Sequence, residues 1–538
     1  MFRCKILKYL RVAVSLAVLA WFGLFFTSFW PRSTAAAKGE FLPALLHSFH
    51  HPAVLAVAAA AGILVLTWLF GRFYCSFCCP LGVLQDIAGR LGRILSFGKL
   101  RYRCSRNWRR FRYLFAIALF ALAAGGLVIP IGFFDPFTLF GRNANSLGQP
   151  ALVELFNYLY TECNWESVMP MEPKPPVPLG VWLPPALFLI AILAAAFWRG
   201  RIFCNLLCPV GALLGTVSRK ARFPLSLSPD ICVRCGKCAK VCKAGCIDVR
   251  NGKLDFERCV LCMNCLNACN FGAIRFGCRP SGPGSSESIP AAEETNGKKS
   301  ESTPEKVDTS RRGFLLTAGA VAAGGALLGA GARKAAFSPS ETGAGTPPPV
   351  MPPGAGNREE FFSRCTGCQL CVANCIGRTL KPARFEYGLG GIGQPRLSFE
   401  NGRCEFNCHA CSSVCPTGAL KDIGLAAKQR CRIGTVHYFR ERCVVVTNHS
   451  SCGACAEHCP TGALQMVPYE GHLTIPKVIP ELCIGCGSCE YICPVLPVKA
   501  VVIYGSRVQD VAADPAEVLR KPETPAAENT GELEEFPF

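Results

Sequence analysis

The chain has 538 residues, 35 of them cysteine, and half of its residues are hydrophobic. This length is sufficient for several domains, and the mean hydropathy of +0.28 indicates membrane spans. The cysteines are too frequent for a disulfide scaffold of this size, and their spacings are those of metal ligands. The basic residues that give the formal charge of +20 are concentrated beside apolar runs. This position indicates membrane topology and argues against a nucleic-acid surface.

Four apolar runs in the first part of the chain are long enough to cross a bilayer, since a helix needs ~20 residues. They cover residues 12–30, 53–70, 113–134 and 181–198. Arginine and lysine cluster before the first run and between the second and third, and are sparse in the other two loops. The positive-inside rule therefore predicts a cytoplasmic N-terminus and a cytoplasmic segment after the fourth run. The alternative, a cleaved signal peptide over the first run, lacks a clear small-residue cleavage site.

The second and fourth runs end alike, in GRFYCSFCCPLG and GRIFCNLLCPVG. Each contains CxxxCP, so Cys75 with Cys79, and Cys204 with Cys208, share one face of a helix. A proline follows each pair and breaks or bends the chain. If helix packing brings the pairs together, they are a candidate extra metal centre or redox-active dithiols. The alternative is a set of buried small residues without chemistry.

Polar residues near the outer ends of the second and third runs are candidate proton acceptors for quinol: His50, His51 and Asp135. Ordinary interfacial histidines and a turn-forming aspartate are the alternative. No histidine lies in or beside the third or fourth run. A bis-histidine haem would thus lack its second ligand, which argues against a cytochrome b.

The segment after the fourth run contains two quartets with the spacing CxxCxxCxxxC. In such runs the tight loop gives three thiolates to one [4Fe–4S] cluster, and the fourth cysteine serves the other cluster. We therefore expect crossed ligation, with Cys232, Cys235, Cys238 and Cys269 in one set and Cys259, Cys262, Cys265 and Cys242 in the other. Zinc sites favour two CxxC pairs with a longer gap, and disulfides between such close neighbours would be strained.

Residues 279–309 are rich in Ser, Gly, Pro, Glu and Lys, a composition that predicts a disordered linker. The sequence SRRGFLL then opens a Gly/Ala-rich span over 310–334 and resembles a twin-arginine export signal. An ordinary fifth helix would give the same topology. We expect this span to stay uncleaved and a flexible tether to follow over 335–357.

Four more quartets follow, which brings the total to six quartets and 24 of the 35 cysteines. Two keep the regular spacing and two carry a longer first gap, and together they predict six [4Fe–4S] clusters. The acidic tail, 511–538, is expected to be disordered. The four quartets are Cys365, Cys368, Cys371 and Cys375; Cys404, Cys408, Cys411 and Cys415; Cys443, Cys452, Cys455 and Cys459; and Cys483, Cys486, Cys489 and Cys493.

The combination of four helices, two CxxxCP motifs and a dicluster domain over residues 1–278 resembles the NapH family of membrane quinol dehydrogenase components and its relatives NosR and CcoG. That resemblance implies that the membrane part takes electrons from quinol. Residues 310–505 resemble the NapG family of exported ferredoxins. Likeness to four-cluster ferredoxins implies that the first of the four later quartets exchanges its fourth ligand with the last, and that the middle two exchange with each other.

We therefore predict an α-helical membrane domain over 1–222 and α+β ferredoxin-like domains over 223–278 and 358–510. The chain should lie in the inner (cytoplasmic) membrane, with the dicluster domain cytoplasmic and the four-cluster domain periplasmic. The sequence contains no nucleophile with a base and no phosphate-binding glycine loop. We expect an electron-transfer protein whose partners are the lipid bilayer, the membrane quinone pool or a cytoplasmic donor, and a periplasmic reductase or electron carrier, with no nucleic acid. The alternative is an assembly factor that reduces a metal or cofactor during biogenesis of a respiratory enzyme.

Overall fold

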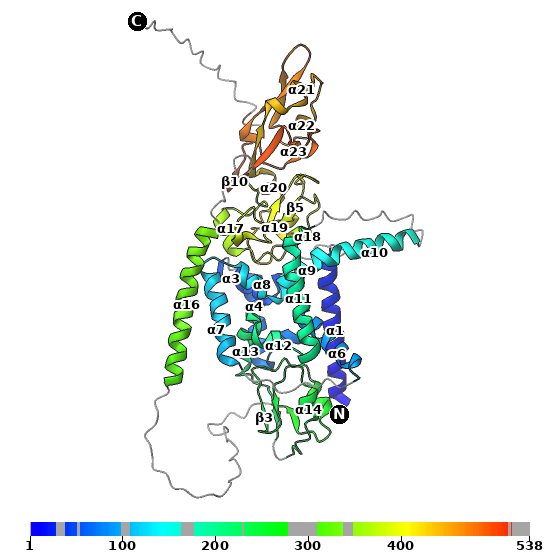
Figure 1. Cartoon of the computed structure of the whole chain (residues 1–538), viewed down its shortest axis with the longest axis vertical. Coiled ribbons are helices and arrows are strands. Elements are labelled where there is room, and N and C mark those ends of the chain that lie inside the picture. Colours follow the sequence, from blue (N-terminus) through cyan, green and yellow to red (C-terminus); the bar gives the residue numbers. More distant parts are fainter. Residues whose placement is uncertain are drawn as a thin grey trace.

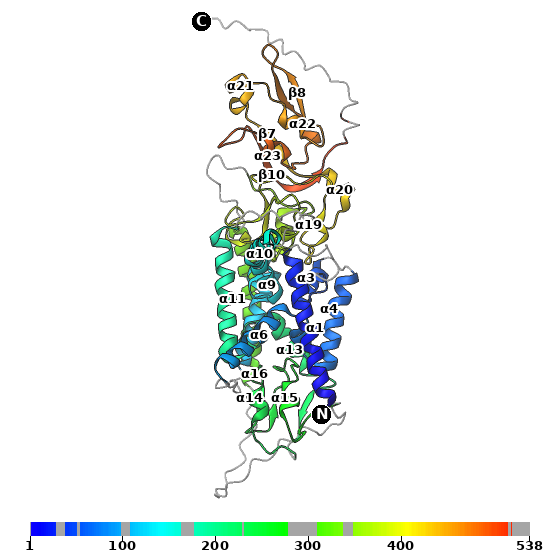
Figure 2. The ribbon, with the colours of Figure 1, turned by 90° about the vertical axis from the view of Figure 1, so that its right-hand side faces the viewer.

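The computed structural model describes residues 2–27, 38–50, 54–97, 108–162, 177–228, 231–277, 309–336, 348–514 and 518. All of the expected linker except its last residue, and nearly all of the acidic tail, lie outside these residues, as do His51 and the side chains of His50, Arg311 and Arg312. Three parts follow one another along the long axis (Figure 1). A helical module stands in the middle, an N-proximal ferredoxin domain lies at one end, and a C-terminal ferredoxin domain lies at the other. Figure 2 shows the same order from the side.

The helical module contains more helices than the four expected, because short helices follow the apolar runs. Its elements are α1 (Phe2–Phe26), α3 (Phe41–His50), α4 (Val54–Phe70), α5 (Tyr74–Phe77), α6 (Pro80–Leu95), α7 (Arg109–Ala124), α8 (Ile129–Phe134), α9 (Pro136–Asn143), the π-helical turn η1 (Ala144–Gly148), α10 (Gln149–Glu162), α11 (Leu179–Arg199), α12 (Ile202–Leu206) and α13 (Pro209–Ser218).

Three described helices are long and apolar enough to cross a membrane: Ile6–Phe26, Leu179–Arg199 and Gly313–Gly331. The second expected span, α4, is a shorter apolar helix of 17 residues. The third expected span is interrupted, since α7 ends at Ala124 and α8 begins at Ile129. Gly126 between them has φ +93, a backbone conformation that ends a helix and that glycine adopts without strain.

In each CxxxCP half of the module, the last of three helices packs against the other half. Each half consists of an apolar helix, a short helix that carries the first cysteine, and a further helix that begins at the motif proline. The further helix of the first half, α6, packs along α11 of the second half, and α13 of the second half packs along α4 of the first. This cross-packing brings the two motifs together in the interior.

The N-proximal ferredoxin domain is built from two short antiparallel strand pairs, β1 with β4 and β2 with β3. Each cysteine loop leads into a short helix. The elements are β1 (Leu225–Leu227), α14 (Lys237–Lys240), β2 (Ile247–Asp248), β3 (Lys253–Leu254), α15 (Asn264–Ala268) and β4 (Ile274–Phe276).

The C-terminal ferredoxin domain has a half that lies against the helical module and a half that forms the far tip of the molecule (Figure 1). Antiparallel pairs β5–β6, β8–β9 and β7–β10 hold it together, and β10 returns to the near half, where Val508 bridges Asn357. The elements are α17 (Arg358–Arg364), α18 (Leu370–Ala373), β5 (Leu380–Pro382), η2 (Leu389–Gly391), β6 (Pro395–Leu397), α19 (Ala410–Ser413), α20 (Gly424–Arg430), β7 (Cys431–Tyr438), η3 (Arg440–Arg442), α21 (Val444–Asn448), α22 (Ala454–Glu457), β8 (Leu464–Pro468), β9 (Thr474–Val478), η4 (Pro480–Leu482), α23 (Ser488–Ile492) and β10 (Val501–Val511).

The segment expected as a tether is partly built into this domain. Gly505 donates a backbone hydrogen bond to Pro348, and the Asn357 side chain caps α17 by accepting from the backbone N–H of Glu359. The domain therefore begins by residue 348, ten residues before the expected boundary.

Helix α16 (Thr309–Ala336) runs beside α7 (Figure 1). Small residues form the contact: a Cβ at Gly329 would lie 2.8 Å from the carbonyl oxygen of Leu122, and one at Gly125 would lie 2.5 Å from that of Ala326. Such small-residue stripes let helix backbones approach closely in a bilayer.

Both ferredoxin domains share a hydrophobic core with the helical module. One core joins Phe22, Phe26 and Phe137 of the module to Cys365 and Cys368 of the C-terminal domain. The other joins the CxxxCP cysteines to those of the N-proximal domain, including Cys238 and Cys259. The three parts are thus packed against one another.

Candidate metal centres

The cysteine loops with the regular spacing share one backbone geometry. The residues on either side of the second cysteine are left-handed in all four: Arg234 and Gly236, Leu261 and Met263, Gly367 and Gln369, and Gly485 and Gly487. Two left-handed residues turn the chain tightly around the second cysteine, and four of these eight are not glycine, so the surrounding structure must hold them there.

In the N-proximal domain the thiols gather in crossed sets, as expected from the spacing. Cys232, Cys235, Cys238 and Cys269 line one small cavity. In the second set, Cys259, Cys262 and Cys242 lie close enough to Cys265 to interact with it electrostatically.

Cys246, to which the sequence assigned no role, lies against the second of these sets. Its Sγ is 3.4 Å from that of Cys242, and the residue is 2% exposed. In the sequence, only its position four residues after Cys242 could have indicated that it lies beside this set.

In the C-terminal domain the exchange of fourth cysteines differs from the expectation. Cys415 of the second quartet lies with Cys365, Cys368 and Cys371, while Cys375 of the first quartet lies with Cys404 and Cys411. Both expected exchanges, the one between the first and last quartets and the one between the middle two, are therefore wrong. The physical reason is that the first two quartets fold together as one half of the domain, far from the tip.

The last two quartets also exchange with each other. Cys459 lines one small cavity with Cys483, Cys486 and Cys489. Cys493 packs with Cys443 and Cys452 in a separate apolar cluster at the tip.

These sets form a sequence from the helical module to the tip. Cys365 and Cys368 lie beside Arg142 of α9 in the helical module. The backbone N–H of Cys404 donates to the carbonyl of Cys486 at 2.9 Å, so the second set adjoins the third. The set with Cys443 comes last.

The four CxxxCP thiols converge. Cys75, Cys204 and Cys208 all lie close enough to Cys79 to interact with it electrostatically, and all four residues are at most 4% exposed. Cys79 and Cys208 each begin the following helix, where their sulfurs accept from the backbone N–H groups of Gly82 and Gly211 at 3.4 and 3.3 Å.

The arginine of each GR motif reaches across to the opposite half. Arg72 donates to the carbonyl of Cys204 at 3.1 Å and to the side-chain oxygen of Asn205 at 3.0 Å. Arg201 donates to the carbonyls of Cys75 and Gly82, and to Asp86 at 2.8 Å. Both arginines are at most 1% exposed. These partners could not be predicted from the sequence, because each lies 115 residues or more away along the chain.

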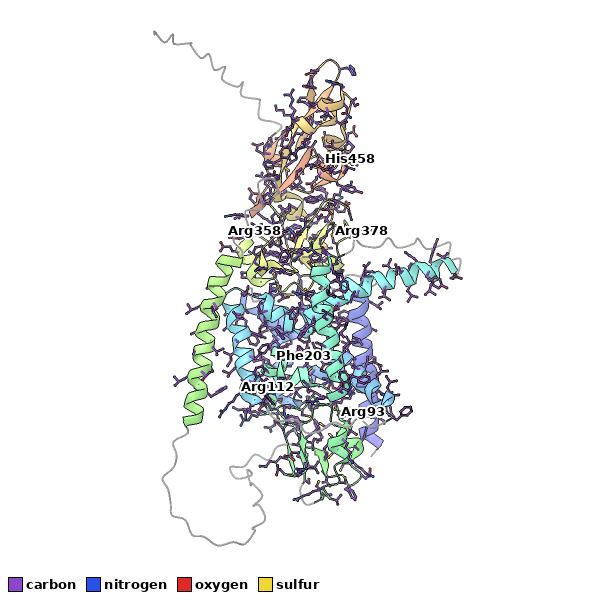
Figure 3. All side chains as sticks on the ribbon, in the orientation of Figure 1. Arg93, Arg112, Phe203, Arg358, Arg378 and His458 are labelled. Carbon is purple, nitrogen blue, oxygen red and sulfur yellow. The ribbon has the colours of Figure 1, made fainter. Side chains whose placement is uncertain are left out.

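The four-thiol site is joined directly to the N-proximal domain. The Ser76 hydroxyl donates to the carbonyl of Val260, the residue after Cys259. Lys243, the residue after Cys242, accepts from the backbone N–H of Arg201 and pairs with Asp86 at 3.0 Å. Figure 3 shows Arg112 at this end of the module, where it pairs with Glu257.

The first cysteine loop of the C-terminal domain sits on the opposite end of the module. Buried Arg142 donates to the carbonyls of Thr366 at 2.8 Å and Gly367 at 2.9 Å. The Asn145 amide donates to the Gln369 side chain at 3.1 Å. A Cβ at Gly141 would lie 2.8 Å from the carbonyl of Cys368, so the close approach needs glycine.

The environments of the thiols fit anionic clusters. Buried cations accompany the sets: Arg142 lies beside Cys365 and Cys368, Lys428 beside Cys404 and Cys486, and Lys243 beside Cys262. Four thiolates around a [4Fe–4S] cube leave a net negative charge, which a buried cation stabilises.

Three thiols of the C-terminal domain hold their protons when no metal binds them. Burial raises the pKa of the Cys368 and Cys404 thiols to about 12 and that of Cys455 to about 11. Metal binding must therefore displace these protons. Among the described residues, no group of three His, Cys, Asp or Glu side chains is arranged to hold a single metal ion. In a [4Fe–4S] cube each thiolate binds a separate iron atom, so the four thiolates need not converge on a single ion.

The expected quinol residues are not brought together among the described side chains. Asp135 caps α9, where it accepts from the backbone N–H of Thr138 at 2.9 Å and from its hydroxyl at 2.8 Å. His51 and the side chain of His50 lie outside the described residues. A quinol role for these three residues stays a prediction.

Comparison with family models finds iron–sulfur domains along the chain. A 4Fe-4S binding domain model matches residues 52–98 and 181–228, the two CxxxCP halves of the helical module. A second model with the same description matches residues 229–245, 256–272 and 362–375, and a 4Fe-4S dicluster domain model matches residues 450–496. Together with the gathered thiols, these matches define an iron–sulfur electron-transport protein.

Similar proteins indicate which kind of iron–sulfur protein this chain is. The ferredoxin-type protein NapG of Escherichia coli K12 is 32% identical over 202 residues, which are 35% of this chain and 83% of that protein. The chain therefore belongs to the ferredoxin-type family of NapG. It is also similar to the ferredoxin-type protein NapF of the same organism, with 25% identity over 29% of this chain and 86% of NapF. No solved structure matches the chain.

The chain is also similar to the putative electron transport protein YccM of Escherichia coli K12. It is 26% identical over 229 residues, which are 42% of this chain and 55% of YccM. This chain thus spans little more than half of that protein. The NapG resemblance expected from the sequence is confirmed, and the NapH-like fusion stays a prediction.

Proposed function

We propose that the chain is an inner-membrane electron-transfer protein that takes electrons from quinol, or from a cytoplasmic donor, and delivers them to a separate periplasmic reductase. The six thiol sets would hold six [4Fe–4S] clusters, and each cluster, when bound, takes up and releases one electron. The four CxxxCP thiols would hold a further centre.

The observation that carries this proposal is the contact between Arg142 and the first cysteine loop of the C-terminal domain. Arg142 is 5% exposed and bonds two consecutive backbone carbonyls of that loop, Thr366 and Gly367. A carrier that diffused freely from the membrane would not need such a buried contact. We infer that the near half of the C-terminal domain receives electrons at the surface of the helical module, and that the tip delivers them.

The charge pattern and the position of the two ferredoxin domains at opposite ends of the module (Figure 2) support the proposed orientation. If the apolar helices cross the bilayer, these domains lie on opposite sides of it. A reporter active only in the periplasm should work when fused after Val511 and fail when fused near Ser285. The reverse result would reverse the proposed electron path.

Quinol oxidation can be tested on the anaerobically purified full chain in lipid nanodiscs. Menadiol, a soluble naphthoquinol, should bleach the visible absorbance of the clusters. Bleaching by dithionite but never by menadiol would remove quinol as the donor and leave the cytoplasmic donor.

A further inference from the structure

A cavity of about 240 Å³ lies where the C-terminal domain meets the helical module. Its walls come from η1, the first turn of α10, the start of α11, and the near half of the C-terminal domain. Arg378, which lines it, lies at this junction in Figure 3. Pockets for drug-sized ligands have volumes of roughly 300–1,000 Å³, so this cavity suits a ring-sized headgroup.

Two buried hydrogen-bond acceptors at this cavity have no partner. Asn145 and Gln149 both line it and are 4% exposed, and their side-chain oxygens, Oδ1 and Oε1, make no hydrogen bond. Such orphaned groups are costly, because each forfeits its bond to water. Both residues flank or belong to the π-helical turn η1, and such turns occur frequently at functional sites. A ligand that donates hydrogen bonds would satisfy both oxygens.

Apart from Ser146, Arg378 and Lys381, the other residues that line the cavity are apolar, and they lie next to a thiol set. Leu147, Pro178 and Trp182 line the cavity from the module, and Val372, the residue after Cys371, lines it from the C-terminal domain. Helix α10 leaves the module sideways at this level (Figure 1) and exposes Leu155 and Leu159. An apolar helix surface in this position suits the lipid interface, from which an apolar molecule would enter.

We propose that this cavity binds the ring of a membrane quinol, whose two hydroxyl groups donate hydrogen bonds to the amide oxygens of Asn145 and Gln149. This inference rests on the proposed function and assigns its donor site. Oxidation of one quinol to quinone releases two electrons and two protons. The electrons go to two oxidised clusters, one each, beginning with the set that includes Cys371, and the protons go to water at the cavity mouth.

The test compares Gln149→Leu with Gln149→Glu in the full chain in nanodiscs. The leucine removes the acceptor oxygen, so menadiol should reduce the clusters at least tenfold more slowly, while dithionite reduces the same amount of cluster. Glutamate keeps an acceptor oxygen and should restore most of the rate. Binding of the quinol analogue heptyl-hydroxyquinoline N-oxide, followed by quenching of its fluorescence, should weaken in parallel. Trp182→Leu offers a second variant should Gln149→Leu fail to fold.

A second groove supplies the matched control. It lies at the opposite end of the module, where Arg93 is labelled in Figure 3, and Arg90 lines it. Arg90→Gln should leave the menadiol rate unchanged. If Arg90→Gln slowed reduction and Gln149→Leu did not, the cavity assignment would fall and the quinol function would stand. If menadiol failed to reduce the wild-type protein that dithionite reduces, both would fall.

Discussion

Arg72 and Arg201 show how single side chains hold the four-thiol site together. Each donates to the carbonyl of the first motif cysteine in the opposite half. Arg201 has Asp86 as a counter-ion, whereas no carboxylate pairs with Arg72 among the described residues. A buried, unpaired cation is costly. Thiolates of a bound centre would provide the missing negative charge.

We predict that Arg72→Met destabilises the helical module by about 3 kcal/mol or more, because several buried acceptors lose their donor at once. The protein should also lose any iron above 24 atoms per chain, while the six ferredoxin-type clusters remain. Thermal unfolding and iron analysis measure the two effects. Arg250→Met, at an exposed turn of the N-proximal domain, is the control and should change stability by about 0.5 kcal/mol or less. Unchanged iron and stability in Arg72→Met would contradict this account.

Gly82 and Gly211 permit the close approach at the same site. A Cβ at Gly82 would lie 2.4 Å from the carbonyl oxygen of Cys75, and one at Gly211 would lie 2.2 Å from that of Cys204. We predict that Gly82→Ala costs about 1–3 kcal/mol through overpacking and displaces Cys75. Gly62→Ala in α4, where a Cβ meets nothing within 4 Å, should be neutral. Equal unfolding temperatures for the two variants would show that the motif tolerates a side chain.

At the residue scale, the sequence predicted which cysteines matter because a tight loop fixes its thiols by spacing alone. It could not predict Arg72, Arg142 or Gln149, because their roles depend on partners brought close only by the fold. The crossed sets of the N-proximal domain were predictable, since only two quartets were available to exchange. Among four quartets the spacing left several exchanges open.

At the scale of elements, the contact between α16 and α7 packs the second half of the chain against the first. Gly325 and Gly329 of α16 face α7, whereas a Cβ at Gly324 would meet nothing within 4 Å. We predict that Gly329→Leu separates α16 from α7, because the leucine would clash with the carbonyl of Leu122. Disulfide crosslinking between cysteines introduced into the two helices should fail in Gly329→Leu and persist in Gly324→Leu. Crosslinking that survives Gly329→Leu would show that this contact does not hold the helices together.

The exchange between neighbouring cysteine loops gives a second prediction at this scale. Cys415→Ser should disturb the cluster held with Cys365 in the near half, and Cys493→Ser should disturb the one held with Cys443 at the tip. Each variant should lose up to four of the 24 expected iron atoms. Because the near half lies against the module and the tip does not, only Cys415→Ser should alter docking, which limited proteolysis detects. If Cys493→Ser changed the near half instead, the first quartet would exchange with the last after all.

At the scale of the whole molecule, the thiol sets run from the N-proximal domain through the four-thiol site to the tip. Hydrogen bonds join the four-thiol site to the N-proximal domain, through Ser76 and Val260, and the module to the first cysteine loop, through Arg142. This order depends on the packing of α6 and α13 against the opposite halves of the module. The apolar runs were visible in the sequence, but this packing was not, because nothing local records which helix packs against which.

The route that we propose for electrons from a cytoplasmic donor crosses the helical module through the four-thiol site, whereas electrons from quinol enter the chain beyond that site. The most direct measurement uses proteoliposomes with cytochrome c trapped inside and a reduced ferredoxin outside, since neither protein crosses a bilayer. We predict that the wild-type chain reduces the trapped cytochrome c. A variant with serine at Cys75, Cys79, Cys204 and Cys208, which keeps its other clusters, should do so at least tenfold more slowly. Equal rates in the two proteins, or no reduction by the wild type, would contradict this route.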